Sequence, residues 1–200
     1  MIESMSDLRS IYAEPKARSL AKQLDRLDPH CRKFIGLSPF LVLATTGKDG
    51  RVDASPRGGA PGFVAVIDDR RLHLPDALGN NRLDSYTNIV ETGRCGTIFF
   101  LPGMDETLRI NGRARLRNEP EILARFPRER HPPRVVVEID VEEAYLHCAK
   151  ALMRSRLWSD DHRIDRDMFP SMGQMIKDQS GSPEPAETRQ EMLARYVHEL

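Results

Sequence analysis

Two short segments combine an arginine with glycines and small polar side chains. They are Ser55-Pro56-Arg57-Gly58 and Gly79-Asn80-Asn81-Arg82. A guanidinium can donate two hydrogen bonds at once to phosphate oxygens. Asn80 is a favourable helix N-cap, and the first turn of a helix offers an anion its free N–H groups and the positive end of the dipole. We therefore expect the segments to form two arms of one phosphate-binding site, in which Arg57 and Arg82 converge.

Other nucleotide, catalytic and metal motifs fit poorly. The glycines at 58, 59 and 62 lead into a second strand instead of opening a helix, unlike the glycine pattern of dinucleotide folds. No Gly-x-x-x-x-Gly-Lys-Ser/Thr motif occurs, and no nucleophile-elbow pattern is visible. The His-Cys pairs at 30–31 and 147–148 are adjacent residues, which on a helix point about 100° apart. We expect no metal site.

The composition excludes several classes of protein. Thirty basic and 30 acidic side chains balance, and aromatic residues make up only 6% of the chain, so a basic groove with stacking platforms for nucleic acid is disfavoured. No apolar run reaches the length of a membrane span, and the first residues lack the features of a signal peptide. Three widely spaced cysteines do not make a disulfide framework. We expect a cytoplasmic protein without nucleic-acid or membrane partners.

The hydrophobic pattern predicts helices, then short strands, then helices again. Residues 6–36 have helical spacing in two or three pieces, and runs between residues 40 and 141 predict six short strands with one helix at 80–91. This order indicates an α+β fold built on an antiparallel six-stranded barrel with flanking helices. We expect residues 1–36 to pack on the barrel as a helical segment and residues 37–160 to form the barrel. Residues 161–200 are then a C-terminal extension with a linker at 177–186 and a final helix.

The clearest strand covers residues 107–117. Small or apolar residues occupy the even positions and polar residues the odd ones, so one face should be buried and the other wet or facing a partner. Thr107 and Arg109 therefore share the polar face. Four arginines on such a face are usual for a solvated edge.

Residues 144–158 carry a helical spacing with a cationic side. His147, Lys150, Arg154 and Trp158 share that side, and Trp158 is the single tryptophan of the chain. The side is either an exposed face or a binding element. In the second case Lys150, Arg154 and Ser155 reach an anionic cofactor while Trp158 covers a flat ring.

Four segments in this order resemble the pyridoxamine 5'-phosphate oxidase-like FMN-binding split-barrel family, and within it a flavoprotein branch. They are Ser55-Pro56-Arg57-Gly58, Gly79–Asp84, Thr107–Ala114, and the run from His147 to Trp158. The resemblance covers roughly residues 30 to 160 and implies a split barrel, a homodimer with the cofactor at the interface, and FMN as cofactor. By position it makes Ser55, Arg57, Asn81 and Arg82 the phosphate and ribityl contacts.

The resemblance also implies where the flavin ring lies. The strand at 107–117 lies beside the ring in the related fold, so Thr107 or Arg109 is expected to stabilise the negative charge that develops on reduced flavin. Lys150, Arg154, Ser155 and Trp158 would then complete the site of the other protomer. The resemblance implies that FMN itself carries out the chemistry, so no catalytic side chain is assigned. The implied function is that of an FMN-dependent oxidoreductase acting on a small organic substrate.

The chain departs from true pyridoxamine phosphate oxidases in two places. The run Pro61–Asp68 lacks the Arg and Lys of their basic strand, and their C-terminal Arg-Leu-His motif is missing, although His162-Arg163 lies nearby. Oxidation of pyridoxamine phosphate is therefore not expected. Alternatives are a non-catalytic module that stores or senses flavin, a deazaflavin protein, or a haem protein of the same fold with His147 as axial ligand.

Overall fold

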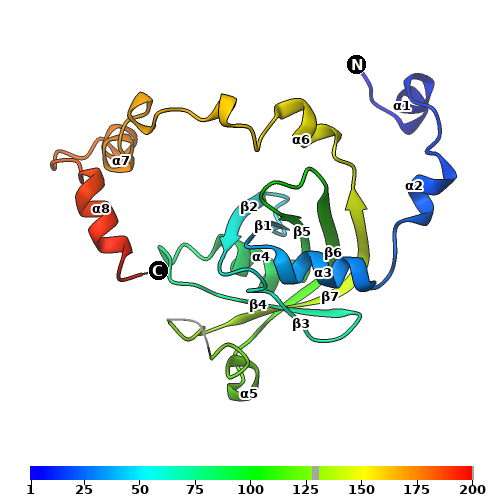
Figure 1. The fold of residues 1–200 in the computed structure, drawn as a ribbon, viewed down its shortest axis with the longest axis horizontal. Helices are drawn as coiled ribbons and strands as arrows, with labels where there is room; N and C mark the ends of the chain where they lie inside the picture. Colours follow the sequence, from blue (N-terminus) through cyan, green and yellow to red (C-terminus); the bar gives the residue numbers. More distant parts are fainter. Residues whose placement is uncertain (128–130, 200) are drawn as a thin grey trace.

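Seven antiparallel strands form one sheet in the order β2-β1-β5-β6-β7-β4-β3 in the computed structural model, which describes residues 1–127 and 131–199 (Figure 1). The strands are β1 Phe40–Thr46, β2 Val52–Gly58, β3 Ala65–Val66, β4 Arg71–Pro75, β5 Arg94–Phe100, β6 Thr107–Arg117 and β7 Val136–His147. The predicted split barrel of the α+β class is confirmed, with seven strands instead of six because the two-residue β3 also pairs with β4. Residues 128–130, within the expected barrel, and Leu200, at the end of the expected extension, lie outside the described residues.

The helices occupy the two ends of the chain and two connections within the barrel. They are α1 Met5–Ile11, α2 Ala17–Ala21, α3 Pro29–Leu37, α4 Asp84–Thr92, α5 Pro120–Leu123, α6 Lys150–Ser155, α7 Met172–Ser180 and α8 Arg189–Tyr196. Short 3-10 turns cover Asp160–His162 and Arg166–Met168. In the N-terminal segment α3 buries Cys31, Phe34 and Ile35 against the core, whereas α1 and α2 bury no residue.

The alternation predicted for β6 is confirmed from Leu108 to Arg115, whereas Thr107, expected on the wet face, is buried. Leu108 and Ile110 are fully buried, and Arg109 and Arg113 are exposed. The pairing of β6 with β7 shifts at Asn111 and Gly112, which marks a β-bulge. A Cβ atom on Gly112 would collide with the carbonyl oxygen of Asp140, so only glycine fits at this point.

The internal helix begins later than predicted. We expected it to start at Asn80, but α4 starts at Asp84 with Leu83 as its N-cap. The side chain of Asn80 accepts a hydrogen bond from the Arg82 backbone N–H at 3.1 Å, and Asn81 and Leu83 have φ angles of 59° and 61°. This turn keeps the chain out of the right-handed helical region until Asp84.

The helical spacing at 144–158 was partly misleading. Residues 144–147 belong to the end of β7, because Ala144 exchanges backbone hydrogen bonds with Leu24 at 2.9 and 2.8 Å and pairs with Ile110 of β6. Helix α6 is limited to six residues, and Arg156 ends it in the left-handed conformation. The last strand, predicted at 134–141, therefore runs from 136 to 147.

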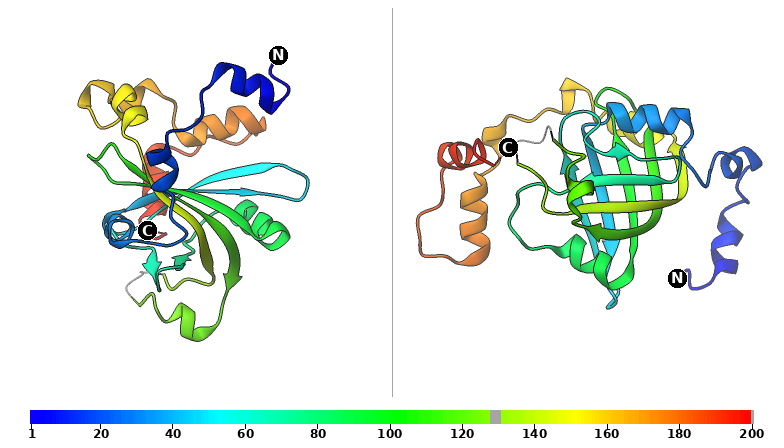
Figure 2. Two further views of the ribbon diagram at one scale, coloured as in Figure 1. Left: turned by 90° about the vertical axis from the view of Figure 1, so that its right-hand side faces the viewer. Right: turned by 90° about the horizontal axis from the view of Figure 1, so that it is seen from below.

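The two ends of the chain project from the barrel on opposite sides (Figure 2). The predicted final helix is present as α8, but the linker is shorter than expected because α7 continues to Ser180.

The helices in the described part of the chain include none that is both long and apolar enough to cross a membrane.

Candidate functional site

The junction between β2 and α4 contains a cluster of hydrogen-bonded polar side chains. Ser85, in the first turn of α4, is 2% exposed and donates to Asp53 Oδ2 at 2.5 Å. Ser55 donates to the same oxygen at 2.8 Å. Arg57 Nη2 donates to Ser85 Oγ at 2.9 Å, and its Nη1 donates to the carbonyl oxygen of Pro56. The Arg57 guanidinium, on the edge strand β2, is thus held at the start of α4.

The register of the β1–β2 hairpin places these side chains where α4 packs. Paired residues in a sheet point to the same face, and the pairs are Asp53 with Thr45, Ser55 with Leu43, and Arg57 with Leu41. Leu41 and Leu43 are fully buried in the core. Helix α4 covers this face and is tied to β1 by hydrogen bonds from Asn88 to Thr45 and from Thr92 to the carbonyl oxygen of Thr46.

The loop before α4 carries the other two residues of the predicted phosphate site. Asn81 is exposed, and Arg82 Nε is bound to Asp84 Oδ2 at 2.8 Å. The N-cap residue Leu83 has no side-chain acceptor, so the first N–H groups of α4 donate no hydrogen bond to its side chain. Leu83 is not glycine, so its left-handed conformation is strained, and such strain concentrates at binding sites.

Tyr86 adds a protonated phenol beside this junction. Burial raises the pKa of Tyr86 to about 12, and the charge of Asp76 adds to the rise while Arg57 opposes it. The hydroxyl is therefore a hydrogen-bond donor at neutral pH. Asp53, Ser85 and Tyr86 were not among the residues predicted from the sequence, although the Ser85 hydroxyl near the start of the helix was a usable signal.

The second group of predicted residues lies on and beside the start of β6. Thr107 is buried, whereas Arg109 is exposed and donates from Nη1 to the Tyr145 hydroxyl at 2.5 Å. Lys150 and Arg154 are exposed on α6, and Ser155 donates to the carbonyl oxygen of Leu152 in the preceding turn.

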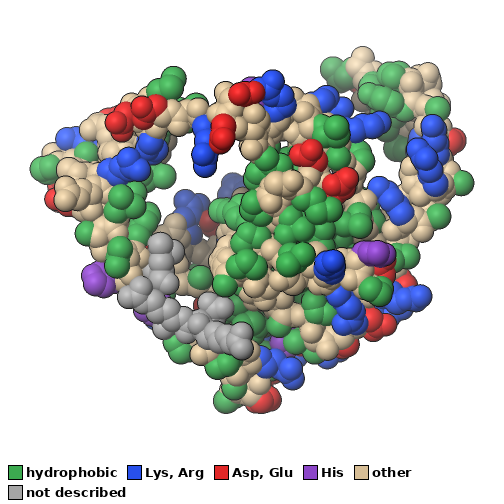
Figure 3. Space-filling model, in the orientation of Figure 1, with side chains coloured by type: hydrophobic (Ala, Val, Ile, Leu, Met, Phe, Trp, Pro, Cys, Tyr) green, Lys and Arg blue, Asp and Glu red, His purple; other side chains and the backbone are tan. Residues whose placement is uncertain are grey.

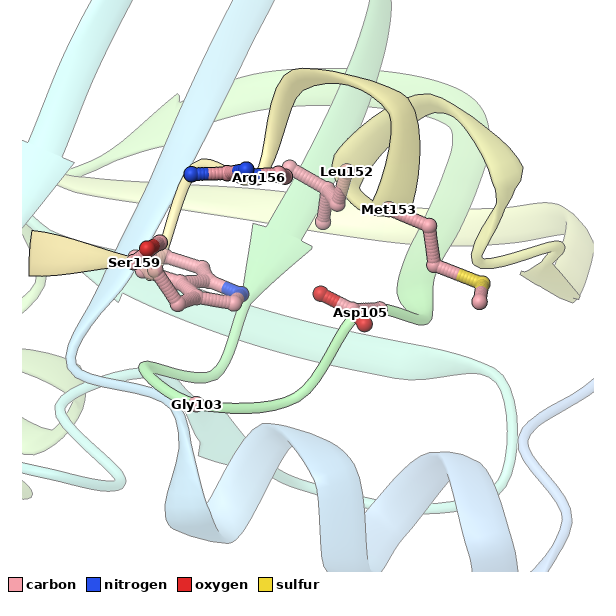
Figure 4. A pocket seen from close by; sticks show the side chains of 7 residues that line it. Gly103, Asp105, Leu152, Met153, Arg156 and Ser159 are labelled. Carbon is pink, nitrogen blue, oxygen red and sulfur yellow. The ribbon is translucent and has the colours of Figure 1, made fainter. Parts of the chain in front are cut away.

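Trp158 follows α6 and lines a surface pocket of about 330 Å³. Its indole Nε1 donates to the carbonyl oxygen of Met104 at 2.9 Å, which fixes the ring against the β5–β6 connection. Asp105, Leu152, Met153 and Arg156 also line the pocket, and Figure 4 shows Asp105 between the side chains of Met153 and Ser159. Arg156 is paired with Asp161. The pocket therefore combines an aromatic ring, an apolar helix face and a carboxylate.

The two groups of candidate residues lie on opposite faces of the sheet. Arg57, Leu41, Phe99 and Leu108 occupy one row across four strands and face the core and α4. Arg109 lies in the next row, which it shares with Ile98, Val42 and Pro56 on the outer face. Within one chain the side chains of Arg57 and Arg109 therefore do not converge on one ligand through the same face of the sheet.

The remaining arginines of β6 are neutralised by β7. Glu138 is 2% exposed and accepts hydrogen bonds from His73 at 2.8 Å and from Arg115 and Arg117 at 2.7 Å each. Burial alone would raise the pKa of Glu138, but the hydrogen bonds from His73, Arg115 and Arg117 outweigh it and lower the pKa to about 2. This network stabilises the barrel.

No group of three or more His, Cys, Asp or Glu side chains lies in a metal-binding arrangement within residues 1–127 and 131–199.

These features define a split-barrel protein with a polar junction between its edge strand and internal helix. Residues 27–148 match the family described as pyridoxamine 5'-phosphate oxidase. The match spans more than half of the chain, and the chain belongs to this family. No curated protein matches the chain.

Solved structures of low sequence identity share the fold. Two structures of HupZ from Group A Streptococcus are each 16% identical to the chain and cover 60% of it, with TM-scores of 0.51 and 0.50. The chain covers 99% and 92% of those two proteins. An FMN-binding protein from Syntrophomonas wolfei subsp. wolfei is 16% identical, with 58% of this chain and 83% of that chain covered and a TM-score of 0.46. The HupZ structures support the split-barrel fold.

Proposed function

We propose that the chain is an FMN-binding flavoprotein and an FMN-dependent oxidoreductase acting on a small organic substrate. The observation that carries the proposal is the position of the Arg57 guanidinium, 2.9 Å from Ser85 in the first turn of α4. A fixed guanidinium beside a helix N-terminus is a suitable environment for a phosphate group. Membership of the pyridoxamine 5'-phosphate oxidase family supports the same cofactor.

The side chains at the junction fit the phosphate end of FMN. Arg57 has further N–H donors besides the two bound to Ser85 and Pro56. The hydroxyls of Ser55 and Ser85 donate to Asp53 in this structure, so each would have to turn away from that carboxylate to bind a phosphate. Arg82 and Asn81 lie in the loop that enters α4, where they can reach an anion at the helix start. Bound FMN would supply hydride or electron transfer, whereas the protein anchors the cofactor and shapes the substrate pocket.

We propose a homodimer, which the separation of the two candidate groups supports. Thr107 and Arg109 alternate with Leu108 and so lie on the face opposite Arg57. We propose that they serve, with the α6 residues, the cofactor bound mainly by a second copy. The outer face of β1, β2 and β5 supports this, because it is apolar and partly exposed. Its residues include Phe40, Val42, Ala44, Val52, Ala54, Pro56, Ile98 and Phe100. Such an exposed apolar surface is typical of a protein–protein interface.

Absorption of the freshly purified protein tests the proposal. We expect flavin bands in the visible region, release of FMN on denaturation, and renewed binding when FMN is added to the stripped protein. A Soret band would indicate haem instead, and release of a deazaflavin would change the cofactor but keep the site. A colourless protein that does not bind FMN in a titration would contradict the proposed function.

A further inference from the structure

The C-terminal extension, residues 161–199, is folded but bonds little to its own barrel. Helices α7 and α8 pack on each other, with hydrogen bonds from Ser171 to the carbonyl oxygen of Glu187 and from Arg195 to the Glu187 carboxylate. A hydrogen bond from His131 Nε2 to the carbonyl oxygen of His198 at 2.9 Å connects the end of the extension to the segment before β7. Figure 3 shows open space between the extension and the barrel.

The helices of the extension are encoded locally by strong caps. Ser171 accepts from the Gln174 N–H at the start of α7, and Gly181 ends that helix in the left-handed conformation. Thr188 and Glu191 form a capping box at the start of α8. These signals specify helices, yet isolated helices of this length are marginal in water and are normally stabilised by packing. The extension therefore requires a surface that its own barrel does not provide.

Large apolar side chains of the extension are exposed. Phe169 is 58% exposed, Met168 is 74% exposed, and Ile164 and Ile176 are 61% and 55% exposed. They follow one another along the segment between α6 and α7 and continue onto α7. A run of this kind is the pattern of a segment that lies across another protein surface.

We propose that residues 161–199 form an arm that packs on the barrel of a second copy of this chain. The occupant is a second copy because the arm starts directly after Trp158, in the region that serves the other copy in the proposed function. The exposed apolar face of β1, β2 and β5 points to the same partner. The inference thus rests on the proposed homodimer and adds the element that holds it together. Because each copy packs its arm on the barrel of the other, formation of the dimer and completion of the two proposed cofactor sites occur together.

Substitutions in the full-length chain test the arm. We expect the double variant Ile164→Asp/Phe169→Asp to raise the dimer dissociation constant about tenfold or more in analytical ultracentrifugation, because two apolar contacts are replaced by buried charges. Val90→Asp is the matched control, since Val90 is 73% exposed on α4, and its dissociation constant should change less than about twofold. Circular dichroism should show that both variants remain folded. An unchanged dissociation constant in the double variant would overturn the proposal.

Cross-linking identifies the surface on which the arm packs. Lys177 lies on α7 and the chain has few lysines, so its amine-reactive cross-links to barrel lysines such as Lys48 are readily assigned. In an equimolar mixture of unlabelled and nitrogen-15-labelled protein, exchanged through monomers, the arm predicts that about half of the cross-links from Lys177 to the barrel join one labelled and one unlabelled chain, as random pairing requires. Cross-links confined to single chains would place the arm on its own barrel and refute the inference.

The two proposals fail separately in these experiments. A protein that binds FMN but dimerises independently of residues 164 and 169 retains the proposed function and loses the arm. A colourless protein whose dimer depends on those residues retains the arm and loses the flavin.

Discussion

Arg57 Nη2 donates a hydrogen bond to the hydroxyl of Ser85 at 2.9 Å and so connects the edge strand β2 to the first turn of α4. The two residues are separated by two strands and a long loop in the chain. Their contact brings a guanidinium to a helix N-terminus, which is the physical basis of the proposed phosphate site.

Replacement of Arg57 tests that site. We expect Arg57→Ala to weaken FMN binding by about 1.5–3 kcal/mol, the range for hydrogen bonds to charged groups, or roughly 10- to 150-fold. Arg51→Ala is the control on the same hairpin, because the Arg51 side chain is 91% exposed. Fluorescence titration with FMN gives both affinities. Equal affinities of the two variants for FMN would show that Arg57 does not bind the phosphate.

Replacement of Arg82 should have a smaller effect than replacement of Arg57. The Arg82 side chain is 73% exposed, and the Asp84 carboxylate bound to its Nε offsets part of its charge, so its attraction for an anion is weakened. We expect a loss of about 0.5–1.5 kcal/mol for Arg82→Ala in the same titration. A loss larger than that of Arg57→Ala would make the loop, and not the strand, the main anchor.

Trp158 reports on the position of the ring. The chain contains one tryptophan, so tryptophan fluorescence reports on one position, the surface pocket that Trp158 lines. We expect FMN to quench this emission, and we expect Trp158→Ala to change the fluorescence of bound FMN while Trp158→Phe changes it less. Identical flavin spectra for the native protein and Trp158→Ala would remove this residue from the site.

The Glu138 network predicts a loss of stability in acid. The pKa of Glu138 in the folded protein is about 2, below its ordinary value of 4.5. The charged carboxylate therefore stabilises the fold fully above about pH 4.5, and this contribution is lost as the pH falls toward 2. Its size is on the order of 2 kcal/mol, because the Arg115 side chain is half exposed and solvent screens part of the interaction.

Urea unfolding at a series of pH values measures this contribution. Glu138→Gln should be less stable than the native protein at pH 6, and the difference between the two proteins should shrink between pH 4.5 and pH 2.5. Both proteins contain the same other carboxylates, so the effect of their titration on the free energy of unfolding cancels in the difference. A difference that stays constant over this range would contradict the assignment.

The β-bulge in β6 predicts a strict requirement for glycine. Gly112→Ala would push a methyl group against the carbonyl oxygen of Asp140, and we expect a loss of about 2 kcal/mol or more in the free energy of unfolding. Gly36→Ala is the control, because no atom lies within 4 Å of the added Cβ and alanine favours the helix. Thermal unfolding should show that the control is as stable as the native protein or more stable.

Local patterns predicted much of the fold because they depend on neighbouring residues. The strand at 40–46, the alternation of β6 and the final helix are present, since period-two and helical spacing record which side chains must be buried. The start of α4 was misplaced because the Asn80 side chain binds the Arg82 backbone in a turn and does not cap the helix. Residues 144–147 were read as helical because spacing alone does not reveal that Leu24 and β6 complete a sheet there.

Periodicity and short motifs are enough to predict the class of fold, the family and the arginines that could bind a phosphate. The tertiary structure decided which of those side chains meet. The register of β2 against β1 directs Arg57 toward α4, and the alternation of β6 directs Arg109 to the opposite face. Neither direction is contained in a single segment, since each depends on the pairing of strands that are distant in the chain.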